Sequence, residues 1–167
     1  EKTGKNIFSD EQGEDSAVFR SYIAGLQRYI PEATMLFAPY VNSYRRFMGM
    51  LSSPINVQWG YDNRTVGLRV PRSEPEARRV ENRVPGADAN PYLAFAATLA
   101  AGYLGMKQHL SPSEPVEGSA YNLPHSLPRE VSEAAALLRG SAGMREMLGD
   151  RFIDVYCEMK EEEYQEF

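Results

Sequence analysis

The stretch INVQWGYDNRTVGLRV, residues 55–70, decides the expected fold. On either side of the turn-forming residues 61–64, apolar side chains alternate with polar or small ones. A period of two is typical of a strand with one face buried. Residues 55–61 and 66–70 therefore predict two half-buried strands, and the short connection favours an antiparallel pair.

A third alternation follows at residues 79–84, where Arg79, Glu81 and Arg83 share one face of a strand. Segments with apolar residues at helical spacing precede and follow these strands in the sequence. The chain is therefore expected to be an α+β domain in which antiparallel strands are backed by helices. Residues 40–44 are expected to be extended or looped, and the proline-rich residues 111–128 to form an ordered surface excursion. The predicted helices are 16–30 with Asp15 or Ser16 as cap, a short helix from Pro31 that Pro39 ends, a helix from Asn90-Pro91 to Leu104, and 132–139, 142–148 and 150–167.

Composition excludes several classes of protein. With 167 residues, of which 43% are apolar, the chain is one domain or a piece of a larger one. It has no apolar run of membrane-spanning length and no signal core, so we expect a cytoplasmic protein that does not bind membranes. The single Cys157 and the separated His109 and His125 exclude a disulfide framework and a histidine cluster. Without a glycine-rich phosphate loop, nucleophile elbow or Cys–His pair, hydrolase and Rossmann functions lose support.

Residues 44–83 form an arginine island. They hold eight arginines, no lysine and four carboxylates, so this window carries +4 while the rest of the chain carries −9. The planar guanidinium grips carboxylate or phosphate with two bonds, which predicts anion recognition. The alternative is a set of structural ion pairs on a solvated sheet. Nucleic acid is a weaker hypothesis, because the whole chain is acidic, with a pI of about 5.2.

Five motifs in this order and spacing resemble the C-terminal catalytic region of the glutamine synthetase family. Residues 4–8 also resemble the segment that follows the family's histidine motif, so the resemblance covers nearly all of the chain. The five motifs are Asn42-Ser43-Tyr44-Arg45-Arg46, Trp59-Gly60-Tyr61-Asp62-Asn63-Arg64, Arg69-Val70-Pro71, Arg79-Val80-Glu81-Asn82-Arg83 and Ala87-Asp88-Ala89-Asn90-Pro91-Tyr92-Leu93.

The resemblance implies an ATP-dependent ligase. Members of the family phosphorylate the γ-carboxylate of L-glutamate with ATP and Mg²⁺ or Mn²⁺, and an amine then displaces the phosphate. By their match to the family's motifs, Arg46, Arg64 and Arg83 would hold glutamate and its γ-glutamyl phosphate, with Arg46 and Arg64 as catalytic residues. Positioned cations suit phosphoryl transfer, in which the protein supplies mainly charge and orientation.

The same match assigns the nucleotide and the metal. It implies that Arg64, Arg69 and Arg79 lie on the ATP side and that Glu81 is a metal ligand. A lone carboxylate among arginines is otherwise a plain salt bridge, so the metal role of Glu81 depends on the resemblance.

Departures from the family's pattern point to the acceptor amine. Ser52 stands where ammonia-using members carry the flap glutamate that binds ammonium, Glu76 replaces a lysine near the ATP site, and Arg45 replaces another lysine. Together with residues 151–156, these changes resemble the γ-glutamylpolyamine (γ-glutamylputrescine) synthetase branch. We therefore expect an alkylamine or polyamine acceptor, with Ser52 and apolar Met48, Met50 and Leu51 making room for it. Glutamine synthetase using ammonia and a non-catalytic homologue remain the alternatives.

The resemblance also implies that residues 1–167 are part of a larger enzyme. The family's N-terminal β-grasp domain, the first part of the catalytic domain and most of the metal ligands are expected outside this chain, as is the end of the C-terminal tail beyond Phe167. The family builds its active site between subunits of a homo-oligomeric ring, with a dodecamer among the possible sizes. We accordingly expect residues 1–167 alone to be inactive.

Overall fold

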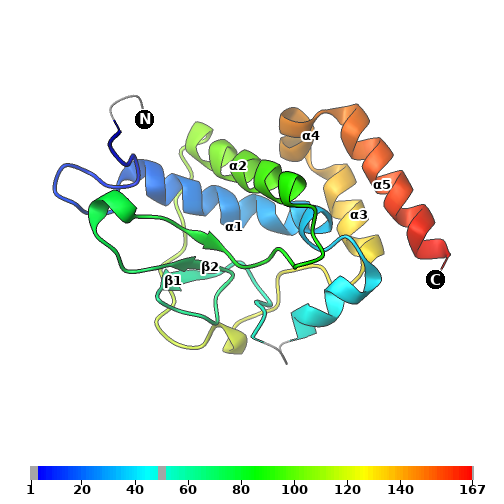
Figure 1. Cartoon of the computed structure of the whole chain (residues 1–167), viewed down its shortest axis with the longest axis horizontal. Coiled ribbons are helices and arrows are strands. Elements are labelled where there is room, and N and C mark those ends of the chain that lie inside the picture. Colours follow the sequence, from blue (N-terminus) through cyan, green and yellow to red (C-terminus); the bar gives the residue numbers. More distant parts are fainter. Residues whose placement is uncertain (1–3, 49–51, 167) are drawn as a thin grey trace.

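The computed structural model describes residues 4–48 and 52–166 and arranges them as helices packed on one small sheet (Figure 1). Helices α1 and α2 lie side by side across the middle, and α3, α4 and α5 gather toward the C-terminus. This is the expected α+β arrangement. The elements in chain order, with η for a 3-10 helix, are α1 (Ala17–Phe37), η1 (Val41–Met48), β1 (Trp59–Tyr61), β2 (Leu68–Val70), η2 (Pro75–Ala77), β3 (Glu81–Asn82), α2 (Pro91–Lys107), η3 (Ala120–Asn122), α3 (Val131–Gly140), α4 (Ala142–Leu148) and α5 (Asp150–Gln165).

Helix α1 is one continuous helix where two were expected. Ser16 caps its start, as predicted, by accepting a hydrogen bond from the N–H of Phe19 at 3.1 Å. Pro31 lies inside the helix and does not begin a second one. Its ring removes a backbone donor, but the buried face continues across it through Ile30 and Ala33, both fully buried. Packing of that face therefore outweighs the missing hydrogen bond.

The remaining helices follow their sequence signals. Asn90 caps α2 by accepting from the N–H groups of Tyr92 and Leu93 at 3.0 and 3.3 Å, and Pro91 occupies the first turn, as predicted. Helices α3, α4 and α5 also lie close to their predicted ranges. Within the described residues, no helix combines the length and the apolar character needed to cross a bilayer.

Helices α1 and α2 approach each other through glycine. A Cβ added at Gly25 would lie 2.3 Å from the carbonyl oxygen of Ala101 and 2.7 Å from the Cα of Gly105. A Cβ at Gly102 would fall 2.0 Å from the ring of Tyr22. The two helix backbones therefore touch at a distance that only residues without side chains permit.

The first strand pair is parallel, so the expected antiparallel pair of 55–61 with 66–70 was wrong. Trp59 pairs with Leu68 and Tyr61 with Val70 in the same direction. Strand β3 then pairs antiparallel with β2, which makes the order β1-β2-β3. The strands are also shorter than the alternation predicted.

The connection at residues 62–67 explains the parallel pairing. Asn63 accepts bonds from the N–H and hydroxyl of Thr65, while its amide donates to the carbonyls of Val116 at 2.9 Å and Gly118 at 2.8 Å. These bonds hold the loop beside the 111–128 segment, away from the path of a hairpin. Each strand is only three residues and about 10 Å long. Residues 62–67 are therefore enough to lead the chain from the end of β1 back to the level of its start, where β2 begins.

Two further segments complete the frame of the sheet. The expectation that residues 40–44 are extended or looped was wrong in part, because residues 41–48 form η1, which buries Tyr44 and Phe47. The 111–128 segment is an ordered excursion, as predicted. It lies along β1, where the N–H of Val116 donates to the carbonyl of Trp59 at 2.8 Å and the indole of Trp59 donates to Ser113 at 2.7 Å.

Replacing Gly25 with alanine should destabilise the chain by about 1 to 3 kcal/mol, because the new methyl group meets backbone that cannot rotate aside. Alanine is intrinsically the better helix former by about 1 kcal/mol, so a net loss isolates the clash. Urea unfolding measures the effect. Gly140→Ala is the matched control. A Cβ at Gly140 meets nothing within 4 Å, so this substitution should leave stability unchanged or raise it by up to about 1 kcal/mol. Equal stability of the two variants would contradict the close contact.

Candidate active site

The exposed face of β2 and β3 brings together Arg69 and Glu81, which are direct partners in the strand register. Arg69 Nη1 donates to Glu81 Oε2 at 2.9 Å, and Arg69 Nη2 donates to Asp62 Oδ1 at 3.0 Å. The bonds that Arg69 donates to the two carboxylates raise its pKa, and the bond to Glu81 is the larger cause. Arg69 is therefore a fixed cation, held between two acids with its side chain only 20% exposed.

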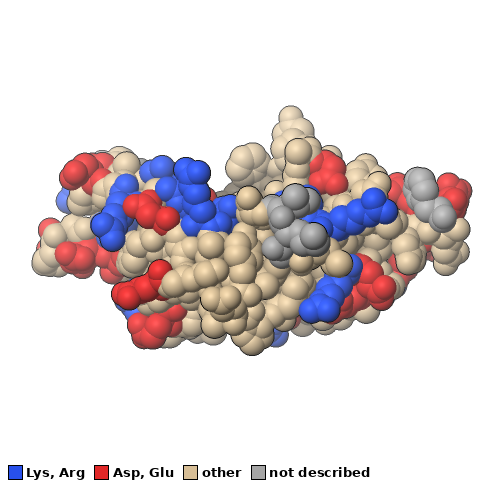
Figure 2. All heavy atoms as spheres, turned by 90° about the horizontal axis from the view of Figure 1, so that it is seen from below, with Lys and Arg blue, Asp and Glu red and all other residues tan. Residues whose placement is uncertain are grey.

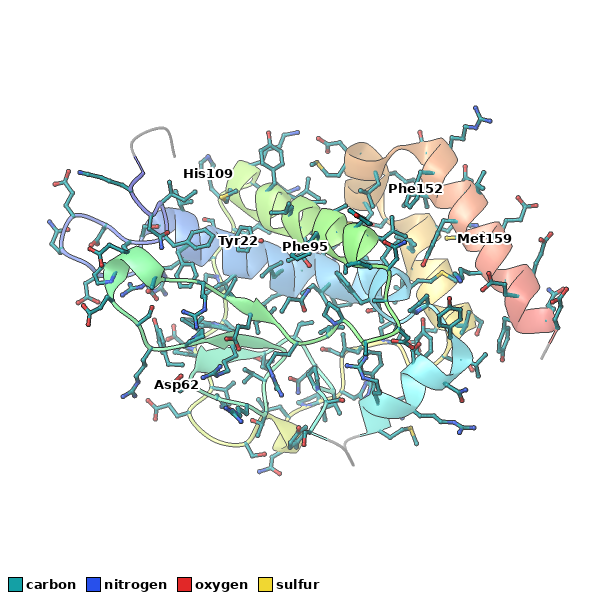
Figure 3. All side chains as sticks on the ribbon, in the orientation of Figure 1. Tyr22, Asp62, Phe95, His109, Phe152 and Met159 are labelled. Atoms are coloured by element: carbon teal, nitrogen blue, oxygen red, sulfur yellow. The ribbon has the colours of Figure 1, made fainter. Side chains whose placement is uncertain are left out.

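Asp62 is a site residue that sequence reasoning missed. It stands just after β1 in the left-handed backbone region, with φ of 47°, and its Oδ1 also accepts from the N–H of Arg72 at 3.3 Å. Figure 3 labels it at the edge of the sheet. The turn was recognised in the sequence, but only the parallel pairing places the end of β1 beside Arg69.

Arg79 and Arg83 share a face with Glu81 in sequence but differ in what they contact. Arg79 is exposed and its Nη2 lies 3.9 Å from Glu81 Oε1, a loose ion pair. Arg83 turns to backbone carbonyls, donating to Val66 at 2.9 Å, to Ser52 at 3.1 Å and to Arg64. Arg83 thus fixes the loop that carries Arg64 against the segment that contains Ser52.

Arg64 offers a guanidinium that is available to a ligand. Its carbonyl is held by Arg83, yet its exposed guanidinium makes no hydrogen bond or ion pair to the residues that the structure describes. A guanidinium on a restrained loop with all of its donors available suits an incoming carboxylate or phosphate.

Arg46 reaches the same region from η1. Its guanidinium lies 3.4 Å from the carbonyl of Val84 and 3.5 Å from that of Pro85, at the limit of hydrogen bonding. Desolvation lowers its pKa, and the charge of Asp88 acts in the opposite direction. Arg46 is a half-buried cation that no carboxylate contacts directly within the described residues, so an anionic ligand would improve its environment.

The arginine island is therefore only partly explained by structural ion pairs. Figure 2 shows basic side chains gathered on one face of the molecule with acidic ones between them. The salt-bridge alternative holds for Arg69, which two carboxylates engage, and loosely for Arg79. It does not account for Arg46 and Arg64.

Glu81 can supply one ligand to a divalent cation. Its Oε2 is bonded to Arg69, while Oε1 has only the distant Arg79 beside it, so a carboxylate oxygen is open to Mg²⁺ or Mn²⁺. Among residues 4–48 and 52–166, no three acidic, histidine or cysteine side chains converge as a metal site. The described residues thus offer Glu81 as a candidate ligand but not a complete centre.

Two contacts that the sequence analysis did not predict connect this face to the rest of the chain. His125 Nε2 lies 2.8 Å from the carbonyl of Phe47 and ties the 111–128 segment to the end of η1, next to Arg46. Asp15 accepts from Arg78 Nη1 at 2.6 Å and from the hydroxyl of Tyr61, which joins the N-terminal loop to the end of β1. Neither contact follows from local spacing, because the partners lie 46 to 78 positions apart.

Of the remaining predicted features, Ser52 is exposed with φ of 49°, and Glu76 is exposed on η2. Met48, the apolar neighbour of the proposed amine pocket, is 66% exposed. The other two apolar residues assigned to that pocket, Met50 and Leu51, lie outside the described residues.

Comparison with known proteins gives a consistent result. A family model described as "Glutamine synthetase, catalytic domain" matches residues 1–167. The chain is 40% identical to type-1 glutamine synthetase 2 of Dictyostelium discoideum over 174 residues, covering 99% of this chain and 33% of that protein. It is also 40% identical to γ-glutamylputrescine synthetase of Escherichia coli (strain K12) over 166 residues, covering 98% and 35%.

A solved structure of GmaS in complex with ADP superposes with a TM-score of 0.84 at 28% identity, and the match covers 96% of this chain and 39% of that one. The chain therefore spans between a third and two fifths of the length of these relatives.

The bond between Tyr61 and Asp15 predicts a pH dependence. Burial, and secondly this bond, raise the pKa of Tyr61 to about 12, above the ordinary value of about 10 for an unfolded chain. A raised pKa means that the contribution to stability is complete below pH 10 and is lost as the pH rises toward 12. The stability advantage of the wild type over Tyr61→Phe should therefore shrink between pH 9 and pH 11, as measured by urea unfolding. The same comparison in an Asp15→Asn background should change less with pH, and a constant advantage in the wild-type background would refute the linkage.

Proposed function

Because the chain belongs to the glutamine synthetase catalytic domain family, we propose that it is part of an ATP-dependent ligase that joins the γ-carboxylate of L-glutamate to an alkylamine or polyamine. The proposed reaction proceeds through γ-glutamyl phosphate. ATP transfers its γ-phosphoryl group to the carboxylate, and the amine nitrogen then attacks the acyl carbon. Phosphate leaves and the nitrogen loses a proton. The observation that carries the proposal is the pair of arginines, Arg46 and Arg64, neither of which has a carboxylate in direct contact among residues 4–48 and 52–166.

The contacts of three arginines support the roles that we propose for them in binding glutamate. Arg64 and Arg46 bind the carboxylates of glutamate and the developing charge of the acyl phosphate, because their donors are uncommitted or weakly committed. Arg83 anchors the loop of Arg64 through backbone carbonyls and lies close enough to assist in binding glutamate.

The nucleotide side of the proposal rests on Arg69, Arg79 and Glu81. Arg69 and Arg79 lie on either side of Glu81 and offer positive charge to the phosphates of ATP. Mg²⁺ or Mn²⁺ would neutralise phosphate charge when bound, with Glu81 as one of its ligands. A Glu81 engaged in that way has less charge for Arg69, whose Nη1 donor then becomes available to a phosphate oxygen.

Ser52 supports an alkylamine as acceptor. Its carbonyl is bonded to Arg83, so this position is tethered beside the glutamate-binding arginines, and its hydroxymethyl side chain places no negative charge there to attract ammonium. Glutamine synthetase using ammonia is the second candidate, because the Dictyostelium type-1 enzyme matches the chain at the same 40% identity as the putrescine enzyme. Because overall identity does not distinguish the two functions, our preference for an alkylamine rests on Ser52.

The decisive assay measures phosphate release by the polypeptide encoded in the whole reading frame, with ATP, Mg²⁺ and glutamate. We expect kcat/KM for putrescine, spermidine or ethanolamine to exceed that for ammonium by at least about tenfold, which corresponds to about 1.4 kcal/mol. Turnover with ammonium alone would favour glutamine synthetase, and no turnover with any amine would favour a non-catalytic homologue. Residues 1–167 by themselves should be inactive, and activity of that fragment would contradict the incomplete metal site.

Changing Glu81 to Gln should lower kcat at least about 100-fold, because the substitution keeps the shape of the side chain but removes the charge that a cation needs. The melting temperature should change by no more than about 5 °C, since this ion pair is partly exposed. Glu158→Gln, at an exposed acid on α5 far in sequence from the sheet, is the matched control and should keep its rate. A Glu81→Gln variant with unchanged activity would reduce the Arg69–Glu81 contact to a structural salt bridge.

A further inference from the structure

Helix α2 has an apolar composition on all sides. From Pro91 to Met106 it contains no charged side chain, and its first charge is Lys107 in the last turn. A surface helix of a soluble domain normally opposes an apolar face with a charged one, whereas a helix that is apolar all round is typical of an interior. In the described chain, α2 packs against α1 and α4, and its Thr98 accepts a hydrogen bond from Asn82 of β3 at 3.0 Å.

The opposite side of α2 exposes four large side chains, which we call the α2 stripe. Tyr92 is 84% exposed, Phe95 72%, Leu99 62% and Tyr103 50%. Their spacing of three, four and four residues places them within an arc of about 80° along one line of the helix. Figure 3 labels Phe95 on α2. Contiguous exposed apolar surface of this kind marks an interface.

We propose that the α2 stripe is the docking surface for the part of the same catalytic polypeptide that lies outside residues 1–167. The relatives are about two and a half to three times as long as the matched region, since the chain covers only 33 to 39% of them. The occupant is accordingly an apolar helix or sheet face of the remaining catalytic domain. This inference rests on the length of the family's members and on the exposed apolar side chains of α2. It does not depend on which amine is the substrate.

The position of α2 relative to the site supports this occupant. The loop that leads into α2 contains Val84 and Pro85, whose carbonyls lie beside Arg46, and Gly86, whose N–H donates to the carbonyl of Phe37 at 3.0 Å. A segment that covers the start of α2 would therefore lie next to the candidate active site, where the described residues form no group of three or more metal-binding side chains.

A second copy of this chain fits the α2 stripe less well. Large side chains bury about 150 to 250 Å² each, so four of them at these exposures offer roughly 500 to 600 Å². A stable interface buries about 800 Å² on each partner. No charge on the stripe directs two copies into register, because its residues are all uncharged.

Thiol labelling tests whether α2 is covered. The native Cys157 is fully buried, so a Leu99→Cys variant has one accessible thiol, and any reaction of Cys157 reports misfolding. Reaction rates with a maleimide are compared between residues 1–167 and the polypeptide from the whole reading frame. We expect Leu99→Cys to react at least about tenfold more slowly in the longer polypeptide than in residues 1–167. The control, Glu158→Cys at an exposed position of α5, should react at rates that differ by no more than about twofold between the two polypeptides. Equal rates for Leu99→Cys would overturn the proposal, and Tyr92→Cys replaces it if that variant misfolds.

Crosslinking then identifies the occupant. With the photoreactive benzoylphenylalanine at position 95 of the longer polypeptide, light should join α2 to a segment outside residues 1–167 within one chain, so the product keeps monomeric mass on a denaturing gel. Crosslinks of dimeric mass would assign the α2 stripe to a second subunit and overturn the proposed occupant. Phosphate release is measured on the same preparation without photolysis, so failure of the proposed activity and failure of this docking are seen separately.

Discussion

The backbone contact between α1 and α2 at Gly25 and Gly105 is the constraint on which the position of the candidate site depends. It allows the two helices to lie against each other, and the buried face of α1 in turn packs on the sheet through residues such as Trp59 and Leu68. The end of α1 holds the loop that precedes α2, because the carbonyl of Phe37 accepts from Gly86. Strand β3 and Arg46 meet that loop from either side. A shift between the helices would therefore move charged groups that make no contact with either glycine.

Charge on the sheet face is divided between cations that are balanced and cations that are not. Arg69 is fixed by Glu81 and Asp62, and this geometry is a structural ion-pair network of modest net stability. Arg64 has a restrained backbone and an unpaired side chain, and Arg46 is partly desolvated with only long contacts to carbonyls. A structure selected for stability alone has no reason to hold two guanidiniums in this way. The unequal distribution of partners, more than the number of arginines, supports a binding site for anions.

The helices could be predicted because their signals are local. Ser16 and Asn90 cap the helices that they precede, and the apolar spacing extends over several turns. The errors arose where a distant contact decides the local structure. Pro31 stays inside α1 because the core on both sides of it continues, and the strands run parallel because Asn63 bonds to the carbonyls of Val116 and Gly118. The residue types of the site could be read from the sequence, but their partners could not. Arg83 turns from Glu81 to three carbonyls, and Asp62 joins Arg69 only through the parallel register.

Two independent features of the molecule support the proposed docking of a further segment. The polar feature is Glu81, a carboxylate with one oxygen open to a cation, around which no group of three or more acidic, histidine or cysteine side chains converges within the described residues. The apolar feature is α2, which has an interior composition but one exposed side. Water can satisfy a half-built metal site at little cost, so the first feature alone says nothing about a missing neighbour. It cannot satisfy four large apolar side chains in the same way, because their exposure carries a free-energy cost that any apolar neighbour relieves. The α2 stripe is therefore the stronger support for the proposed docking of a further segment.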